Sequence, residues 1–219
     1  MSALSSGLLL YGCSLIYGFS GSTNFDQISN NISEVQYGLT LGIVFILVGL
    51  AFKISAVPFH MWAPDVYQGS PTSVTIFFAI LPKIAALSVF IRFLYVPFIN
   101  LIDQWQTIII FVSIASMVFG AVAAIGQKNL KRLMAYSSIS HMGFALAGLA
   151  VGTNEGIQSS LIYISIYLLM NLAFFSCLFM LKRNDIYHED LSDLSGLSKN
   201  HPILALCLLI SLFSLAGIP

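Results

Sequence analysis

The sequence predicts an all-α polytopic membrane protein, and three observations support that prediction. Of the 219 residues, 58% are hydrophobic and only 8% are charged, whereas a soluble domain carries about a quarter charged residues. Seven apolar stretches of helix length account for most of the chain, and each can cross a hydrocarbon core of roughly 30 Å. The short alternating segments typical of a membrane β-barrel are not the pattern of this sequence.

Each predicted span is an apolar stretch bounded by polar or helix-breaking residues. The segment 21–35, with the sequence GSTNFDQISNNISEV, is polar, and we expect an irregular surface loop there. The expected membrane helices cover residues 3–20, 37–58, 72–96, 104–126, 129–151, 156–182 and 201 to the end.

Composition also narrows the function classes. Nine basic and nine acidic residues give a formal net charge of zero, so a nucleic-acid partner is not indicated. Cys13, Cys177 and Cys207 fall in expected helices without a CxxC pair, and we interpret them as free thiols packed among helices. The sequence has neither a glycine-rich dinucleotide pattern nor an iron–sulfur cysteine set. We therefore expect this chain to bind no metal and no redox cofactor.

The distribution of basic residues predicts the orientation. The first, third and fifth loops contain no Lys or Arg, whereas Lys128, Lys182, Arg183 and Lys199 lie in or beside the fourth and sixth loops. The positive-inside rule places these even-numbered loops on the inner side of the membrane. The helix over 37–58 therefore runs from outside to inside.

Two lysines, Lys53 and Lys83, fall inside expected membrane helices. Lys53 is near the middle of an apolar segment, and Lys83 is close to the middle of helix 72–96. A lysine at the bilayer midplane costs roughly 2.5–3.5 kcal/mol on insertion scales. One explanation is a proton relay, because burial favours the neutral amine and a neighbouring carboxylate favours the ammonium. The alternative is structural, with both ammonium groups held by backbone carbonyls between helices.

A helix break closely follows Lys53. Pro58 lacks a backbone N–H and clashes with the preceding turn, so we expect it to break helix 37–58 toward its inner end. Irregular backbone at membrane depth is tolerated where it is buried in protein or lines a hydrated cavity, and discontinuous helices mark ion sites in transporters. Gly217 and Pro219 interrupt the last apolar stretch in a similar way, and we expect the chain to be incomplete. His60, just after the first break, is either a gate or an interface residue.

The helix over 129–151 adds a polar stripe. At 100° per residue, Lys131, Ser138 and His141 lie within about 80° of one another. His141 is deep enough to be buried, and histidine titrates in the range useful for proton transfer. The three side chains are candidates for a relay, and a packing role for His141 is the alternative.

A carboxylate partner for the lysines is missing from the spans. All nine acidic residues fall in predicted loops: Asp26, Glu34, Asp65, Asp103, Glu155, Asp185, Glu189, Asp190 and Asp193. A lysine relay needs an acidic group to stabilise the ammonium. We expect that group to come from additional sequence or from another subunit.

Four stretches resemble the antiporter-like membrane subunits of respiratory complex I, a family shared with multisubunit cation/proton antiporters and membrane-bound hydrogenases. They are FKISAVPFHMWAPDVYQGSP, PKIAALSVFIRF, QKNLKRLMAYSSISHMGF and SLAGIP. The stretch APDVYQGSP separates this chain from the two larger types of subunit in the family, which read Leu-Pro-Asp-Ala-His there. The resemblance covers essentially all of the chain.

The resemblance implies a fold of fourteen helices built from two inverted repeats of five, with the seventh and twelfth helices broken. Residues 1–219 would then be a single, partial transmembrane antiporter-like domain, from the sixth helix to the first half of the twelfth. Pro58 matches the first break, and the stretch from Gly217 to Pro219 matches the second.

The resemblance also implies residue roles. Lys53 matches the lysine of the broken seventh helix, and Lys83 matches the lysine of the eighth helix that links two half-channels. His60 matches a histidine just past the break, and His141 falls at a polar position of the tenth helix. The family's glutamate that pairs with the first of these lysines would precede Met1.

The implied function is a membrane-arm subunit that translocates protons while electrons pass from NADH to quinone in other subunits. The whole complex would use NADH, FMN, iron–sulfur clusters and quinone, none of them bound by this chain. Its partners would be neighbouring antiporter-like and small membrane subunits in the lipid bilayer, in a bacterial inner membrane or a mitochondrial inner membrane. Two alternatives stay open: a subunit of a cation/proton antiporter driven by an ion gradient, and a structural or assembly module with inert lysines.

Overall fold

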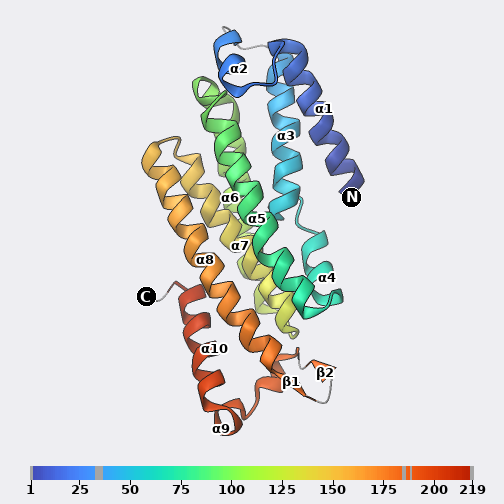
Figure 1. Cartoon of the computed structure of the whole chain (residues 1–219), viewed down its shortest axis with the longest axis vertical. Coiled ribbons are helices and arrows are strands. Elements are labelled where there is room, and N and C mark those ends of the chain that lie inside the picture. Colours follow the sequence, from blue (N-terminus) through green and yellow to red (C-terminus); the bar gives the residue numbers. More distant parts are fainter. Residues whose placement is uncertain (1, 33–36, 184–185, 188, 218–219) are drawn as a thin grey trace.

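The computed structural model describes residues 2–32, 37–183, 186–187 and 189–217, and within these ranges the chain is almost entirely helical (Figure 1). Six of the described helices are long and apolar enough to cross a membrane: α1 (Ser2–Ser20), α3 (Tyr37–Ile54), α5 (Thr72–Tyr95), α6 (Ile102–Ile125), α7 (Leu130–Ala150) and α8 (Asn154–Met180). The seventh predicted span is α10 (Pro202–Leu215), which is apolar but has only 14 residues. The prediction of an all-α polytopic membrane protein is confirmed.

Short elements connect these helices at the two ends of the bundle. Helix α2 (Phe25–Asn31) and the 3-10 turn η1 (Ile99–Leu101) lie at one end, and α4 (Trp62–Gly69) and α9 (Leu197–Asn200) lie toward the other (Figure 1). At the second end, β1 (Lys182–Arg183) pairs antiparallel with β2 (Ile186–Tyr187), and the 3-10 turn η2 (Leu191–Leu194) follows. The predicted outer loop and the predicted basic loop are therefore at opposite ends of the molecule.

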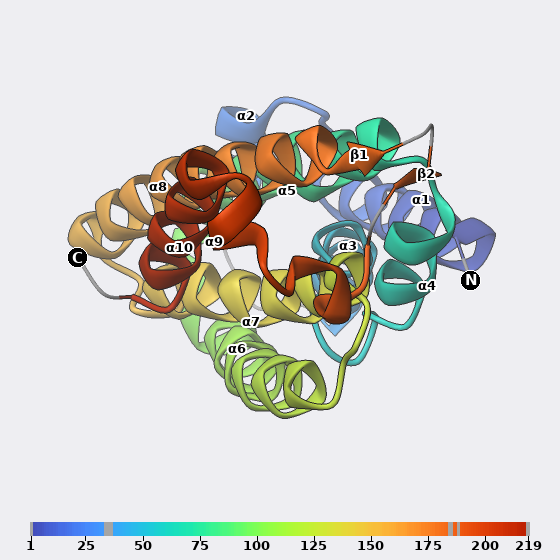
Figure 2. The same ribbon diagram turned by 90° about the horizontal axis from the view of Figure 1, so that it is seen from below.

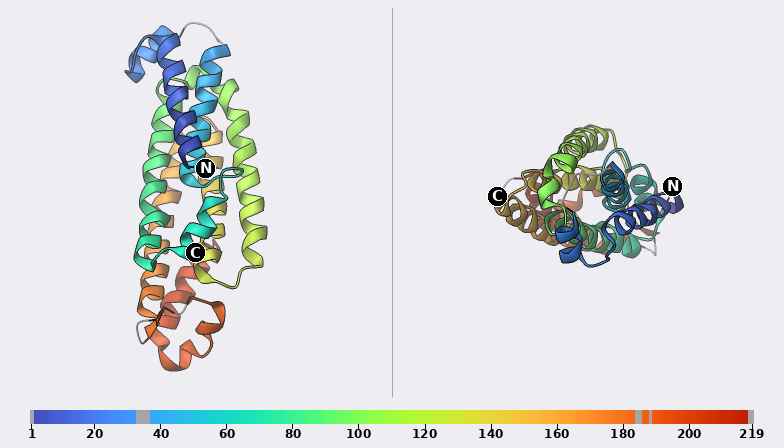
Figure 3. Two further views of the ribbon diagram at one scale, coloured as in Figure 1. Left: turned by 90° about the vertical axis from the view of Figure 1, so that its right-hand side faces the viewer. Right: turned by 90° about the horizontal axis from the view of Figure 1, so that it is seen from above.

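Viewed from below, α5 and α8 lie on one side of the bundle, and α6 and α7 lie on the other (Figure 2). The side view shows α1 beside α3, and α6 along the outside of the bundle (Figure 3). Helices α6 and α7 approach closely because glycines remove side chains from their interface. A Cβ added at Gly120 would lie 2.6 Å from the backbone nitrogen of Ser140, and one at Gly143 would lie 2.8 Å from that of Met117.

The predicted irregular loop at 21–35 contains a helix, so that expectation was wrong over part of its length. The side chain of Asn24 accepts a hydrogen bond from the backbone N–H of Asp26 at 2.9 Å and caps α2. Asparagine at this position satisfies one of the free donors at a helix start. Residues 33–35 of that segment are outside the described ranges.

The break in the second predicted span begins before Pro58. Helix α3 ends at Ile54, and Ser55 takes a left-handed conformation with φ 62°. The chain then passes through turns, including a cis peptide bond between Val57 and Pro58, and continues as α4 from Trp62. Pro58 has no N–H to donate to the carbonyl of Ile54, and its ring would clash with that carbonyl, so the helix cannot continue through Pro58.

Two hydrogen bonds pair backbone groups at this break with side chains, although the surrounding helices are apolar. The backbone N–H of Val57 donates to the hydroxyl of Ser116 on α6 at 2.9 Å. The indole N–H of Trp62 donates back to the carbonyl of Phe52 at 2.9 Å. Because freed backbone groups must find partners at membrane depth, these two contacts stabilise the broken segment.

The buried apolar side chains form two clusters along α5. Ala79 and Ile80 belong to a cluster with α4, α7 and α8, whereas Ala86 and Leu87 belong to a cluster with α3, α6 and α7. Lys83 lies between these positions and is itself fully buried. The fold therefore places a charged side chain at the junction of its two hydrophobic cores.

Candidate proton-transfer site

Lys83 is the most enclosed ionisable side chain of the predicted site. Its side chain is 0% exposed, and its Nζ atom has no hydrogen-bond partner among the described residues. The Nζ atom lies 5.4 Å from the centroid of the Tyr67 ring, within the range of a cation–π interaction. An aromatic face stabilises an ammonium without fixing it as a carboxylate would, so this lysine can exchange a proton.

Pro82 and Tyr67 shape the surroundings of Lys83. Proline has no N–H, so the carbonyl four residues earlier, that of Phe78, loses its donor within the helix. The hydroxyl of Tyr67 donates to this carbonyl at 3.3 Å. The same contact anchors α4 on α5 and holds the aromatic ring beneath the ammonium of Lys83.

A second pair of hydroxyl groups joins α7 to α8. The hydroxyl of Tyr167 donates to the Oγ atom of Ser138 at 2.9 Å, and the carbonyl of Ala79 lies 3.4 Å away as a second acceptor. Both side chains are buried. The predicted relay residue Ser138 is therefore hydrogen-bonded to a hydroxyl group of α8.

His141 faces α8 and borders a cavity. Its Nδ1 atom lies 2.6 Å from the hydroxyl of Tyr163, and its ring centroid lies 5.3 Å from that of Tyr167. The cavity has a volume of about 380 Å³. Side chains of α8 and the end of α10, with Gly217 after it, form its other walls.

Of the two residues predicted to break the last helix, the structure describes Gly217 but not Pro219. Gly217 takes a left-handed conformation with φ 85°, two residues after α10 ends at Leu215. It lines the cavity at His141, so the second break and the histidine meet at one place. Pro219 is outside the described residues.

Lys53 lies elsewhere than the sequence indicated. It was expected near the middle of a continuous helix, but α3 ends one residue later, at Ile54, so Lys53 occupies the last turn. Its side chain is exposed on the surface of the described chain rather than buried. The expectation failed because apolar residues continue past the break, so that hydropathy alone gives no sign of where the helix ends.

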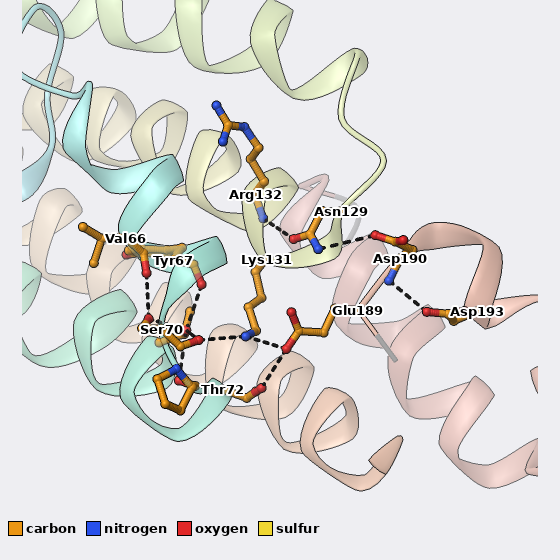
Figure 4. Close-up of polar contacts among 12 residues, drawn as sticks. Val66, Tyr67, Ser70, Thr72, Asn129, Lys131, Arg132, Glu189, Asp190 and Asp193 are labelled. Carbon is orange, nitrogen blue, oxygen red and sulfur yellow. Dashed lines mark hydrogen bonds and ion pairs between the residues drawn. The ribbon is translucent and has the colours of Figure 1, made fainter. Parts of the chain in front are cut away.

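Lys131 is buried, but its partners are not those of the relay (Figure 4). Its Nζ atom lies 2.5 Å from a carboxylate oxygen of Glu189 and donates to the carbonyl of Ser70 at 2.8 Å. The hydroxyl of Thr72 donates to the same carboxylate oxygen at 3.3 Å. The predicted stripe therefore divides, because Lys131 faces the inner loop while Ser138 and His141 face α8.

The loop after α8 is tied to the start of α7 by its backbone as well. The N–H of Leu130 donates to the carbonyl of Glu189 at 2.7 Å, and the N–H of Leu191 donates to that of Lys128 at 2.9 Å. These bonds hold the carboxylate of Glu189 in place opposite Lys131. In the part of the chain that the structure describes, this ion pair links the start of α7 to the loop after α8, beside the start of α5.

His60 is separate from the cluster around Lys83. Its ring centroid lies 4.4 Å from that of Phe119 on α6, and the side chain is partly buried. The contact packs the turn before α4 against α6. It is compatible with either of the predicted roles for His60, a gate or an interface residue.

The sequence reasoning missed three tyrosines and one glutamate. Tyr163 and Tyr167 are four residues apart on α8, which places both hydroxyls on one face of an otherwise apolar helix. That spacing was a usable signal. Tyr67 and Glu189 offered no comparable pattern, because each reaches its partner through a contact distant in the sequence.

Together these residues can hold and pass protons. A lysine without a fixed carboxylate can release a proton as the ammonium and take one up as the amine, while an imidazole and a series of buried hydroxyls can accept one proton and release another. The arrangement joins α4, α5, α7 and α8 and ends at a cavity beside α10.

Comparison with known proteins agrees with this picture. A model of the membrane segment of the NADH:quinone oxidoreductase and Mrp antiporter family matches residues 1–219. The chain is 78% identical to NADH-quinone oxidoreductase subunit N of Pelagibacter ubique and 57% identical to that of Parvibaculum lavamentivorans, in both cases over 100% of its own length. It spans 46% of the length of each of these relatives.

Solved structures show the same fold. The chain matches the Mrp complex of a Dietzia species with a TM-score of 0.90 and 28% identity, covering 100% of this chain and 40% of the other. It matches respiratory complex I of Thermus thermophilus, solved with bound aureothin, with a TM-score of 0.83 and 34% identity. That match covers 100% of this chain and 46% of the other.

Proposed function

Since the chain belongs to the membrane family of NADH:quinone oxidoreductases and Mrp antiporters, we propose that it is part of a membrane-arm subunit that translocates protons. The protons would move while electrons pass from NADH to quinone in other subunits. The observation that carries the proposal is Lys83, a fully buried lysine whose Nζ atom lies over the ring of Tyr67 near the middle of α5. Identity of 78% to a subunit N supports complex I as the assembly.

The proposed path uses Lys53, Lys83 and His141. Lys53 takes up a proton at the end of α3, and Lys83 holds one between the two hydrophobic clusters. His141 receives it beside the cavity at α10. Lys53 is exposed on the described chain, so its carboxylate partner would belong to a segment or subunit that covers this surface.

The two helix breaks would line the proposed proton path. The turns around Pro58 and the left-handed Gly217 interrupt helices next to Lys53 and next to the cavity. Non-helical backbone at these points can line a hydrated route, which a continuous helix would close. A conformational or electrostatic change in neighbouring subunits would separate Lys53 from its carboxylate and release the proton inward.

The chain supplies the proton path and no redox chemistry of its own in this proposal. NADH, FMN, iron–sulfur clusters and quinone would be held by other subunits of the complex. Neighbouring antiporter-like and small membrane subunits would be its partners. Residues 1–219 would form a single partial antiporter-like domain, from the sixth family helix to the first half of the twelfth.

Proton transport by inverted membrane vesicles tests the proposal. Cells would carry Lys83→Leu in the complete subunit, with Lys199→Leu, an exposed lysine of α9, as the matched control. We expect Lys83→Leu to abolish NADH-driven acidification of the vesicles, because leucine cannot hold a proton. Acidification at the normal rate per NADH oxidised would overturn the proposal and favour an inert structural module.

The second candidate is a subunit of a cation/proton antiporter. The TM-score of 0.90 to the Mrp complex favours it, since this value exceeds the 0.83 obtained for complex I. Sequence identity favours complex I instead, because it is 34% to the complex I chain and 28% to the Mrp chain. Transport that depends on sodium and proceeds without NADH would establish the antiporter.

A further inference from the structure

Lys83 and His141 are on different helices, and three buried hydroxyl groups connect their surroundings. These belong to Tyr67 on α4, Ser138 on α7 and Tyr167 on α8. These residues are 0%, 1% and 2% exposed, and Tyr167 also lines the cavity at His141. Each hydroxyl can donate one hydrogen bond and accept two.

The contacts run from the lysine toward the histidine. The Nζ atom of Lys83 lies over the ring of Tyr67 at 5.4 Å from its centroid. Ser138 accepts from Tyr167 at 2.9 Å, and the ring of Tyr167 packs against that of His141. Ser138 and His141 are three residues apart, so they lie one turn from each other on the same face of α7.

The hydroxyl of Tyr167 also lies next to the turn of α5 that precedes Lys83. It is 3.4 Å from the carbonyl of Ala79, four residues before the lysine. Long side chains of a helix point back toward its N-terminus, over the preceding turn. The flexible stem of Lys83 can therefore bring its ammonium toward the oxygen of Tyr167.

Resting on the function proposed above, we propose that Tyr167 and Ser138 carry protons between Lys83 and His141, with Tyr67 positioning the ammonium. Tyr167 has one hydroxyl proton and two acceptors, Ser138 and the carbonyl of Ala79. Of these two contacts, the one with Ser138 leads toward the histidine, which is three residues further along α7. Rotation of this single O–H bond therefore opens or closes the route.

The transfer balances as the movement of one proton. The ammonium of Lys83 gives a proton to the oxygen of Tyr167, which gives its own to Ser138, which gives its own to the imidazole of His141. Each hydroxyl breaks one O–H bond and forms another. Lys83 ends as a neutral amine and His141 as an imidazolium, and no electrons are exchanged.

The decisive variant is Tyr167→Phe, which removes the oxygen and keeps the ring. It would be made in the complete subunit, and NADH-driven acidification would be measured in inverted vesicles. Tyr95→Phe is the matched control, because its hydroxyl donates to the carbonyl of Leu149 at 2.7 Å, away from the relay. NADH oxidation by a soluble artificial electron acceptor would measure how much assembled complex is present.

We expect Tyr167→Phe to lower acidification roughly a hundredfold or more per assembled complex, the low end of what a positioned proton-transfer group contributes. Tyr95→Phe should keep the normal rate. Normal acidification in Tyr167→Phe overturns the proposal. If that variant does not assemble, Ser138→Ala breaks the same hydrogen bond from the other side, and a normal rate there overturns it equally.

The Lys83→Leu experiment separates this inference from the proposed function. Loss of acidification in Lys83→Leu together with normal acidification in Tyr167→Phe would leave the function standing and reject the hydroxyl route. Normal acidification in Lys83→Leu would reject both.

Discussion

The Nδ1 atom of His141 and the hydroxyl of Tyr163 lie 2.6 Å apart, and this hydrogen bond fixes the imidazole at the wall of the cavity beside α10. The tyrosine determines which side of the imidazole remains available. With Nδ1 occupied, Nε2 is the ring nitrogen left to exchange a proton. Orientation of His141 thus depends on a residue of α8 rather than on α7 itself.

Substituting Tyr163 by phenylalanine should slow coupled turnover. Loss of this hydrogen bond removes about 1 kcal/mol of the free energy that holds the imidazole in its orientation. That is equivalent to roughly a fivefold change in the population of the correct orientation. NADH-driven acidification per assembled complex would measure the effect. The control is Tyr17→Phe, at a tyrosine of α1 that is 57% exposed. Equal rates in the two variants would show that the contact does not orient the histidine for transfer.

The ion pair between Lys131 and Glu189 should stabilise the inner end of the bundle. Removing one partner of a buried pair leaves an uncompensated charge, so we expect Glu189→Gln to lower the free energy of unfolding by roughly 3 kcal/mol. Thermal unfolding of the solubilised protein would measure it.

Asp65→Asn supplies the matched control for Glu189→Gln. The pair of Arg132 and Asp65 has an N–O distance of 2.7 Å, but the two side chains are 32% and 73% exposed. Exposed pairs contribute about 1 kcal/mol or less and weaken with salt. Equal destabilisation by the two variants would contradict the inference that the ion pair of Lys131 and Glu189 stabilises this end of the bundle.

Alanine at Gly120 should separate α6 from α7. The added Cβ would lie 2.6 Å from the backbone nitrogen of Ser140, which cannot move independently of its helix. We expect a loss of stability on the order of 1–3 kcal/mol, as for other overpacked interiors. Gly18→Ala on α1 is the control, since nothing lies within 4 Å of its added Cβ. A melting temperature unchanged in Gly120→Ala would show that the two helices can part without loss.

Association with complex I can be measured directly on a native gel of mildly solubilised membranes. We expect peptides of this chain in the band that stains for NADH oxidation, because the chain is 78% identical to a subunit N. Mass spectrometry of the excised band would identify them. Peptides found only in a smaller band without NADH activity would favour the antiporter or the assembly module.

The long helices could be predicted from the sequence because each is a continuous apolar stretch with a polar boundary. Helix α5 was expected over 72–96 and runs from Thr72 to Tyr95. The end of α3 could not be located in this way. Pro58 indicated a break, but the left-handed Ser55 that ends the helix is a response of the backbone with no signature in hydropathy.

The partners of the polar residues were harder to predict than their positions. Lys131 and Ser138 share a face of α7, yet their side chains contact Glu189 and Tyr167 respectively. Those partners lie 58 and 29 residues further along the chain, so they depend on how the helices pack. Helical periodicity determines which face a residue occupies and leaves open which neighbour that face meets.

Pro82 has a consequence for how α5 enters the bilayer. Insertion into a membrane responds to side chains, and by that measure α5 is strongly apolar, with a mean hydropathy of 2.3 over an 18-residue stretch of the helix. The carbonyl of Phe78 has no donor within the helix, and a hydropathy value calculated from side chains does not include this unpaired polar group. Tyr67 meets it at 3.3 Å only once α4 is in place. The carbonyl of Phe78 is therefore without a donor while α5 inserts, and it gains one only when α4 packs against the helix.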